Sequence, residues 1–278
     1  MFSRSAPAYA VLLVLPAVAA IGLFFVVPLA LLVAVSLHAP ALSPTAYQEL
    51  FDASAYPSAL ARTLRIGAEV AVAAVALGYP VAYLAAFAPQ RFRLPLLFAV
   101  LLPFWTSILV RNYSWIYLLQ QRGLVNAILL RLGLVSQPLD LMYDETAVLV
   151  GMTHALLPFA VLPIAVALMG LDRALIEAAH SLGARPWDTF HRVVLPLSLP
   201  GVAAGWLLVF AMALGFFVTP ALLGGGRVLV AATFIYQQVV ELLNWPVAAA
   251  GAIVLLALVT GVIALSRRLL PLDQPLSG

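Results

Sequence analysis

The chain has 278 residues, of which 64% are hydrophobic and only 9% are charged. A soluble domain usually carries about a quarter charged residues, so this composition indicates a protein whose surroundings are mostly lipid. The formal net charge of +3 is too small to indicate nucleic-acid binding, and the absence of cysteine excludes disulfides, thiolate metal sites and cysteine nucleophiles.

Six apolar runs along the chain are long enough to be transmembrane helices. A helix needs about 20 apolar residues to cross a bilayer core, and in lipid the backbone must satisfy its own hydrogen bonds, which favours helices. The runs predict spans at approximately residues 9–37, 64–87, 95–119, 147–170, 199–223 and 248–265. We therefore predict an all-α integral membrane protein with six transmembrane helices, in one membrane domain over residues 1–278.

The first run has an alternative interpretation as a signal peptide, because residues 17–20 read AVAA and resemble a cleavage site. A signal core is typically about 7–15 residues long, and this apolar stretch continues well beyond that length. The length favours a span that is kept in the protein.

The second span contains an acidic residue, Glu69, four residues after Arg65. Ionisable groups inside spans are costly and usually face the bundle interior, and residues four apart can pair on one helix face. Two interpretations remain open: the Arg65–Glu69 pair is a neutralised packing feature, or Glu69 guides a cationic solute along a translocation path.

Aromatic residues of the third span are further candidates for the path, since aromatic faces attract organic cations. Trp105 lies deepest in the span. Tyr113 and Trp115 lie near its end, where the alternative is the aromatic belt at the membrane interface. Arg111, in the same segment, weighs against a purely cation-attracting path unless it is paired.

The segments outside these spans contain short amphipathic stretches. Tyr47, Leu50 and Phe51 lie at helical spacing in the loop 39–61, and residues 124–134 form a possible interfacial helix. His154, alone in the fourth span, is expected to be a hydrogen-bond partner between helices rather than a metal ligand.

No HExxH or GxxxxGK[ST] motif occurs, so the sequence predicts no metal site and no catalytic residue in this chain.

The loop 171–197 concentrates charge in a chain that otherwise avoids it. Asp172 can cap a first short helix, and Gly183 stands where that helix would close through a left-handed residue. Pro186 can start a second short helix, on which Trp187 and Phe190 would share one face with Val194. Such a compact element either docks against another protein, with aromatics and Arg as anchors, or lies on lipid headgroups.

The fifth span contains the candidates for a gate, Gly215, Thr219 and Pro220. Proline removes a helical hydrogen bond and so permits a bend, and glycine permits close backbone approach.

The distribution of arginine gives the orientation. An even number of spans places both termini on one side, and a cytoplasmic placement leaves eight arginines there against six on the other side, a weak positive-inside bias. The eight are Arg4, Arg91, Arg93, Arg173, Arg185, Arg192, Arg267 and Arg268. We therefore expect cytoplasmic N- and C-termini.

One motif in the loop 171–197 resembles a known family. Glu177-Ala178-Ala179, three residues, Gly183, nine residues and then Val193-x-Leu195-Pro196 resembles the EAA loop of ABC importer permeases, EAA-x3-G-x9-I-x-LP, with Val193 in place of Ile. Further segments resemble the spermidine/putrescine-type permeases, at residues 78–83, 102–107, 111–115, 123–126, 217–225 and 244–246.

This resemblance implies a fold, a role and partners. It implies the MetI-like architecture of ABC importer permeases in the bacterial cytoplasmic membrane, with the fifth span lining the path and the loop 171–197 docking in the cytoplasm against an ATPase subunit. The loop residues implied in coupling are Glu177, Ala178, Ala179, Gly183, Arg185, Pro186, Trp187, Asp188, Leu195 and Pro196.

The implied partners are two ATPase subunits that hold ATP and Mg, a second permease subunit (a paralogue or a second copy) and an extracytoplasmic solute-binding protein. The resemblance implies a polyamine as the cargo. Alternatives are an amino acid, an opine, a phosphonate or another small solute, and a stand-alone secondary transporter. A secondary transporter predicts internal symmetry and several intramembrane charges, of which the sequence shows one acid and no evident repeat.

Overall fold

This computed structural model describes residues 6–38, 42–52 and 54–269. Arg4, which entered the orientation argument, and residues 39–41 of the first loop lie outside the described part.

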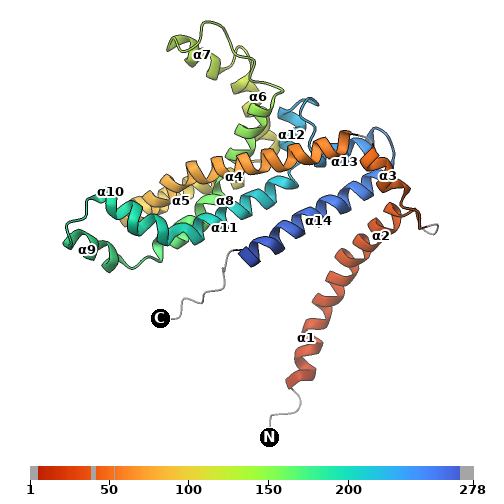
Figure 1. Ribbon diagram of the computed structural model, residues 1–278, viewed down its shortest axis with the longest axis horizontal. Helices are drawn as coiled ribbons and strands as arrows, with labels where there is room; N and C mark the ends of the chain where they lie inside the picture. Colours follow the sequence, from red (N-terminus) through yellow and green to blue (C-terminus); the bar gives the residue numbers. More distant parts are fainter. Residues whose placement is uncertain (1–5, 39–41, 53, 270–278) are drawn as a thin grey trace. The chain divides into compact units, whose positions relative to one another are not determined.

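Every regular element in the described part is helical (Figure 1). The first half contains α1 (Ala6–Ile21), the π-turn η1 (Gly22–Val26), α2 (Val27–Ser36), α3 (Thr45–Asp52), α4 (Ala55–Phe87), α5 (Gln90–Trp105), α6 (Ile108–Leu119) and α7 (Leu124–Arg131). The second half contains α8 (Glu145–Met169), α9 (Arg173–Ser181), α10 (Pro186–Thr189), the π-turn η2 (Phe190–Val194), α11 (Leu195–Leu214), α12 (Val218–Leu223), α13 (Ala231–Val240) and α14 (Trp245–Leu269).

The predicted all-α membrane fold is confirmed. Within the described residues, five helices are long and apolar enough to cross a bilayer core, at residues 14–36, 55–87, 145–169, 186–214 and 245–266. The bent pair α5 and α6 supplies a sixth crossing if it is counted as one span. The short helices α3 and α7 fall where the sequence predicted amphipathic stretches.

The prediction of one continuous third span over residues 95–119 is wrong. Helix α5 ends at Trp105, and the helical segment that begins at Ile108 is bent from it by 98°. Thr106 and Ser107 have ψ angles of 137°, which are extended rather than helical. Pro103 precedes the break, and the hydroxyl of Thr106 donates a hydrogen bond to the Pro103 carbonyl at 3.0 Å.

The predicted bounds of the fifth span, residues 199–223, are also wrong at both ends. The helix runs from Pro186 through η2 to Leu214, so Pro196 and Pro200 do not separate the loop from the membrane helix. In η2 the N–H of Leu195 bonds to the Phe190 carbonyl, one residue further back than in an α-helix. This wide turn directly precedes Pro196, which has no N–H group and therefore needs no hydrogen-bond acceptor one turn back. The helix continues beyond it.

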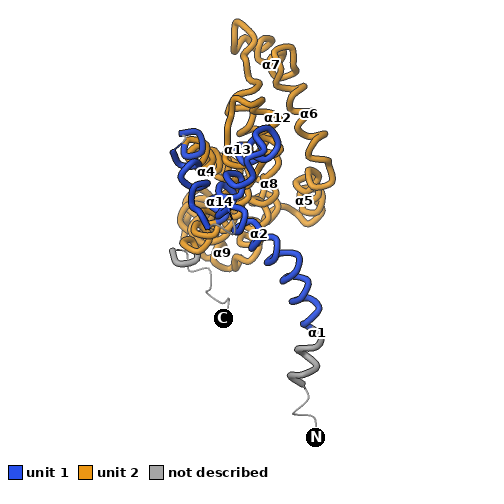
Figure 2. Tube along the Cα trace, turned by 90° about the vertical axis from the view of Figure 1, so that its right-hand side faces the viewer, with its two compact units in different colours: residues 1–57, 234–256 blue, residues 58–233, 257–278 orange. Residues whose placement is uncertain are grey.

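The described chain divides into two compact units, coloured separately in Figure 2. The first contains residues up to 57 and residues 234–256, and the second contains residues 58–233 and those from 257 on. In the first unit the fully buried Tyr56 donates a hydrogen bond to the Gly251 carbonyl at 2.7 Å, and its ring packs against Phe234. The apolar side chains of residues 14–35 there are almost all exposed, as expected of a helix whose neighbours are lipid or another chain.

The core of the second unit is built around α8, and glycines allow neighbouring helices to approach it closely. A Cβ at Gly201 of α11 would lie 2.4 Å from the Cβ of Ala167 and 2.8 Å from the carbonyl of Pro163, both on α8. A Cβ at Gly205, one turn later, would lie 3.0 Å from the Ala160 carbonyl. Because lipid gives no hydrophobic drive for association, such small-residue contacts supply the dispersion energy that holds membrane helices together.

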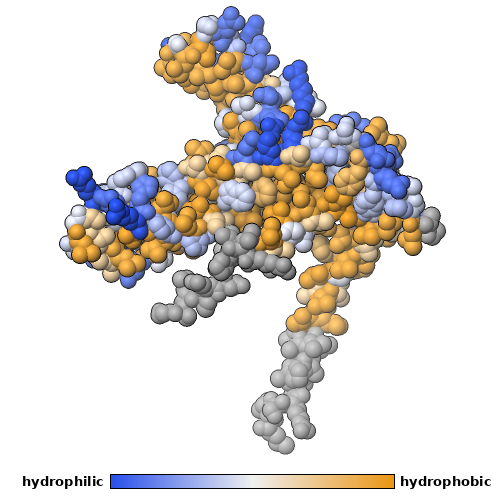
Figure 3. Space-filling model, in the orientation of Figure 1, coloured by the Kyte–Doolittle hydropathy of each residue, from blue (hydrophilic) through white to orange (hydrophobic). Residues whose placement is uncertain are grey.

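The surface of the second unit separates hydrophilic from apolar residues (Figure 3). Hydrophilic residues gather over α9 and α10 and around α7 and the α12–α13 turn, and apolar residues dominate along α4 between them. This distribution is that of a bundle whose middle lies in hydrocarbon and whose ends reach water.

The close approach of α11 to α8 predicts that Gly201→Ala lowers the free energy of unfolding by about 1–3 kcal/mol, since the added methyl group meets backbone that cannot yield. Thermal unfolding of the purified protein in detergent measures this as a lower Tm. Gly261→Ala is the matched control, because Gly261 is also helical and has no atom within 4 Å of its Cβ position. Equal Tm changes in the two variants would contradict the tight α8–α11 contact.

Candidate functional site

The loop predicted to dock against an ATPase begins with α9. The carboxylate of Asp172 accepts a hydrogen bond from the Ala174 N–H at 2.9 Å, which confirms the predicted cap. The helix places two apolar side chains in solvent, since Leu175 is 48% and Leu182 is 88% exposed.

Gly183 ends α9 in a left-handed conformation, as predicted, with φ +83°. The N–H of Ala184 bonds to the Ala179 carbonyl at 3.0 Å and the N–H of Gly183 bonds to the His180 carbonyl at 2.9 Å. This is the Schellman pattern that satisfies the last carbonyls of a helix. No atom lies within 4 Å of the position that a Gly183 Cβ would take, so this turn faces open space.

The next element joins this turn to the membrane helices. Trp187, at the start of α10, is 70% exposed, and its ring stacks on Phe190 at a centroid distance of 5.8 Å. Phe190 in turn packs its ring edge-on against Tyr79 and Tyr83 of α4, at 5.9 and 5.8 Å. The hydroxyl of Tyr79 lies 2.9 Å from that of Ser198 on α11. The exposed tryptophan is therefore connected to α4 through the rings of Phe190, Tyr79 and Tyr83, and the Tyr79 hydroxyl extends this connection to α11.

The structure brings the predicted coupling residues together along one stretch of chain, with the two short helices in contact. Glu177, Ala178, Gly183, Arg185, Pro186, Trp187 and Pro196 are exposed, and Ala179, Asp188 and Leu195 are partly buried. We name residues 172–192 the coupling surface.

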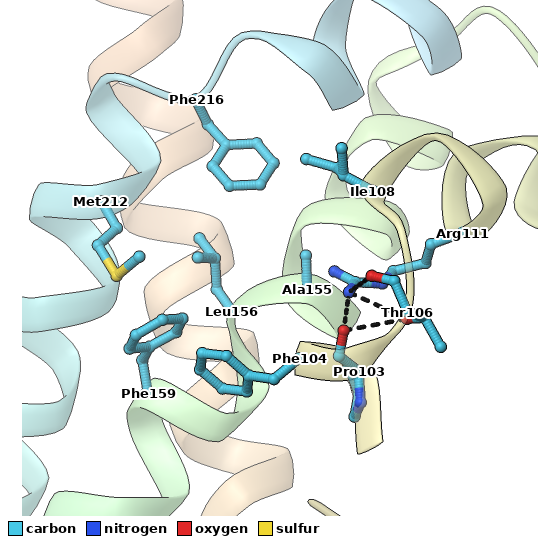
Figure 4. Close-up of a pocket in the computed structure, with 10 residues that line it drawn as sticks. All are labelled: Pro103, Phe104, Thr106, Ile108, Arg111, Ala155, Leu156, Phe159, Met212 and Phe216. Carbon is cyan, nitrogen blue, oxygen red and sulfur yellow. Dashed lines mark hydrogen bonds between the residues drawn. The ribbon is translucent and has the colours of Figure 1, made fainter. Parts of the chain in front are cut away.

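A second candidate site is a cavity of about 250 Å³ inside the second unit (Figure 4). It lies where two apolar helices are interrupted: Thr106 belongs to the break between α5 and α6, and Phe216 belongs to the break between α11 and α12. Its lining residues are Pro103, Phe104, Thr106, Ile108, Arg111, Ala155, Leu156, Phe159, Met212 and Phe216. Non-helical backbone within a membrane is tolerated only inside protein or beside a cavity, so the two breaks and the cavity belong together.

Arg111 stabilises the first break. Its guanidinium donates to the carbonyls of Pro103 and Thr106 and to the Thr106 hydroxyl, the last two at 3.3 and 3.2 Å. The last carbonyls of a helix have no partner within the helix and carry the negative end of its dipole, so a cation is well placed there. Figure 4 shows these bonds at the carboxyl end of α5.

The predicted path residues are distributed differently from this cavity. Trp105 is 67% exposed and packs against Phe98 rather than lining the cavity. Gly215 is exposed at the end of α11, in the break that also contains Phe216. Thr219 and Pro220 are buried in α12, and a Cβ at Gly151 of α8 would lie 2.8 Å from the Thr219 methyl group.

Pro220 therefore does not bend a continuous span. It is the third residue of a short helix, where its missing N–H needs no intrahelical partner. The chain turns at residues 215–217 instead.

The predicted Arg65–Glu69 pair is wrong. Arg65 binds Glu145 at 2.5 Å, and Arg62 binds the same carboxylate at 3.1 Å. Glu145 begins α8 and is far from these residues in sequence, so no local spacing rule could reveal this partner. Among the ion pairs of the described residues Glu69 has none, and it is exposed on α4 in the isolated chain.

The role predicted for His154 is confirmed. Its Nδ1 accepts a hydrogen bond from the Trp115 indole N–H at 3.2 Å, which links α8 to α6. Trp115 is therefore at least partly a packing residue, whereas Tyr113 is exposed.

Sequence reasoning missed the cavity residues Phe104, Phe159 and Phe216 and the role of Arg111. A polar signal was present, because Thr106-Ser107 and Gly215 interrupt apolar runs and the arginine lies one helical turn beyond Ser107. The assumption of continuous spans hid that signal.

Comparison with known proteins gives the family. Residues 75–271 match the binding-protein-dependent transport system inner membrane components. The spermidine/putrescine transport system permease protein PotB of Salmonella typhimurium is 37% identical over 209 residues, covering 75% of this chain and 72% of its own length. That of Haemophilus influenzae is also 37% identical, over 227 residues, covering 81% and 79%.

A solved structure agrees on the fold. A chain in the crystal structure of a bacterial alginate ABC transporter, in complex with an alginate pentasaccharide-bound periplasmic protein, has a TM-score of 0.75 at 21% identity and covers 96% of both chains. The helical bundle, the match over residues 75–271 and the identity to these permeases show that this chain belongs to the binding-protein-dependent inner membrane components, the permease subunits of ABC importers.

Proposed function

We propose that this permease subunit imports a polyamine or a related small amine, and that the coupling surface transmits the movement of an ATPase to the membrane helices. The cargo proposal is supported by the identity to PotB proteins over three quarters of the chain. Glu69 supports it as well, since an exposed carboxylate on a membrane helix needs a partner outside this chain.

The contact that carries the coupling proposal is that of Phe190 with Tyr79 and Tyr83. Trp187 and Leu182 offer an exposed apolar surface to a partner, and Phe190 ties that surface to α4 while η2 continues directly into α11. Force applied at the coupling surface thus reaches two long helices without passing through a flexible loop.

This role sets the orientation and the partners. The coupling surface faces the cytoplasm, where ATP is available, and both termini lie on that side of a six-span chain. Family membership implies a solute-binding protein and ATPase subunits as partners. We further propose two ATPase subunits and a second permease, a paralogue or a second copy, that completes the path.

The chemistry of ATP belongs to the partners. A P-loop requires lysine, and this chain contains none, so we propose that ATP and Mg are held by the ATPase subunits and that this chain acts as a transport subunit rather than an enzyme. When the ATPases close on ATP, they stabilise one conformation of the permease pair. The loaded binding protein also stabilises one conformation. Cargo and nucleotide together therefore shift the populations of the inward-open and outward-open states.

For the coupling surface we predict that Gly183→Asp abolishes uptake while membrane insertion is retained. The new carboxylate would project from an open turn into the docked partner, where an unpaired buried charge costs several kcal/mol. Gly133→Asp is the matched control, because Gly133 also has a positive φ and open space at its Cβ position. Uptake into proteoliposomes and co-purification of the ATPase measure the effect, and equal losses in both variants would contradict docking at Gly183.

For the cargo we predict that Glu69→Gln lowers the rate of spermidine uptake roughly fivefold. This is the effect expected from losing the attraction between one carboxylate and one ammonium group in a water-filled path. Glu241→Gln, which neutralises another exposed glutamate, should leave the rate unchanged. Labelled spermidine uptake by the reconstituted complex measures both. Wild-type protein that imports no spermidine would overturn the polyamine assignment and leave the coupling proposal intact.

A further inference from the structure

The cavity between the two helix breaks has walls suited to the body of an organic cation. Three phenylalanines line it, Phe104, Phe159 and Phe216, and the rings of the first two lie 5.0 Å apart. Met212 adds a polarisable thioether. Aromatic faces attract ammonium groups, and apolar walls accept the methylene groups between them.

One end of this cavity carries hydrogen-bond acceptors. The carbonyl of Pro103 and the carbonyl and hydroxyl of Thr106 converge at the carboxyl end of α5 (Figure 4). A half-helix that ends inside a membrane protein presents unpaired carbonyls and the negative end of its dipole, which is the arrangement that binds cations in transporters with interrupted helices.

In the structure these acceptors are occupied by a cation that belongs to the chain. The guanidinium of Arg111 donates to all three of them, while its Nε is buried and has no hydrogen-bond partner. The described residues give Arg111 no carboxylate partner, so its charge is held by neutral acceptors and by the helix end alone. This contact leaves the Nε of Arg111 unpaired and lacks the opposite charge of an ion pair, which makes an exchange of partners feasible.

We propose that the carboxyl end of α5, with the phenylalanine-lined cavity beside it, is a subsite for an alkylammonium group of the cargo, and that Arg111 occupies this subsite when no cargo is present. The proposal rests on the proposed import of an amine. An ammonium group that enters takes over the carbonyls of Pro103 and Thr106, and Arg111 swings away from the α5 end.

This exchange answers a requirement of transport. A subsite along a path must bind well enough to admit the cargo and weakly enough to release it. A tethered competitor has a high effective concentration, so Arg111 lowers the apparent affinity of the subsite and returns to it after the cargo leaves. It also gives the Thr106 carbonyl a donor between transport cycles.

The test is to remove the competitor and supply a free cation. Arg111→Ala should lower the Tm of the purified complex in detergent, because the Thr106 carbonyl loses its donor and the Pro103 carbonyl keeps only the Thr106 hydroxyl. Putrescine at about ten times its dissociation constant should then raise the Tm of this variant by about 3 °C, while the wild-type protein, whose subsite is filled, responds far less.

Three controls accompany this measurement. Arg122→Ala removes an exposed arginine from the turn between α6 and α7 and should respond to putrescine as the wild-type protein does. The neutral isostere 1,4-butanediol should not rescue Arg111→Ala. Inorganic phosphate at equal ionic strength should change the Tm by the same small amount in the wild-type protein, Arg111→Ala and Arg122→Ala.

Several results would overturn the proposal. Putrescine that raises the Tm of Arg111→Ala no more than that of the wild-type protein, or rescue by butanediol equal to that by putrescine, would leave Arg111 a structural brace only. Phosphate that stabilises the wild-type protein and not the variant would make the cavity an anion subsite built on Arg111.

A second variant guards against a failure to fold. Arg111→Gln is neutral but keeps an N–H donor for the Pro103 carbonyl, and putrescine should also raise its Tm selectively. The outcome is separate from that of the uptake experiment. Selective rescue by putrescine without spermidine import by the wild-type protein would support the cation subsite and reject the polyamine cargo. Spermidine import without such rescue would support the polyamine cargo and reject the cation subsite.

Discussion

The structure depends on the constraint that a backbone inside lipid must find its hydrogen-bond partners within the protein. Most of this chain meets the constraint with continuous helices. These helices are interrupted at residues 106–107 and 215–217, and both breaks lie beside the same cavity. At the first of them Arg111 supplies donors to the carbonyls that the helix end leaves free. Arg111 is the residue that we propose gives way to an ammonium group of the cargo.

Much of the fold was predictable because its signals are local. The apolar runs identified the candidate spans, and Asp172, Gly183 and Pro186 fixed the ends of the short helices because capping and left-handed turns depend on a few neighbouring residues. What failed was non-local. The partner of Arg65 is Glu145, which pairing within one helix could not reveal, and the break after Trp105 depends on contacts made by Arg111 from the next helix.

The candidate sites divide in the same way. The coupling surface is a continuous stretch of chain, so a spaced motif in the sequence was enough to select its residues, and their role in coupling stays a prediction. The cavity is assembled from α5, α6, α8 and the segment around α11, and the predicted path residues Trp105 and Gly215 are neighbours of its lining residues in sequence without lining it themselves. Trp105 was chosen for its depth, but the side chain of a helix-terminal residue can point away from the interior, and here it meets Phe98.

The unbroken helix from Pro186 to Leu214 links these two places mechanically. It contains 29 residues, so it extends for about 43 Å, with Trp187 near one end and Met212 at the other, beside the cavity. The π-turn lies directly before Pro196, and the helix continues past that proline. Moved as one body, a helix of this length turns a tilt of roughly 10° into a displacement of about 7 Å at its far end, which is comparable to the width of a small solute.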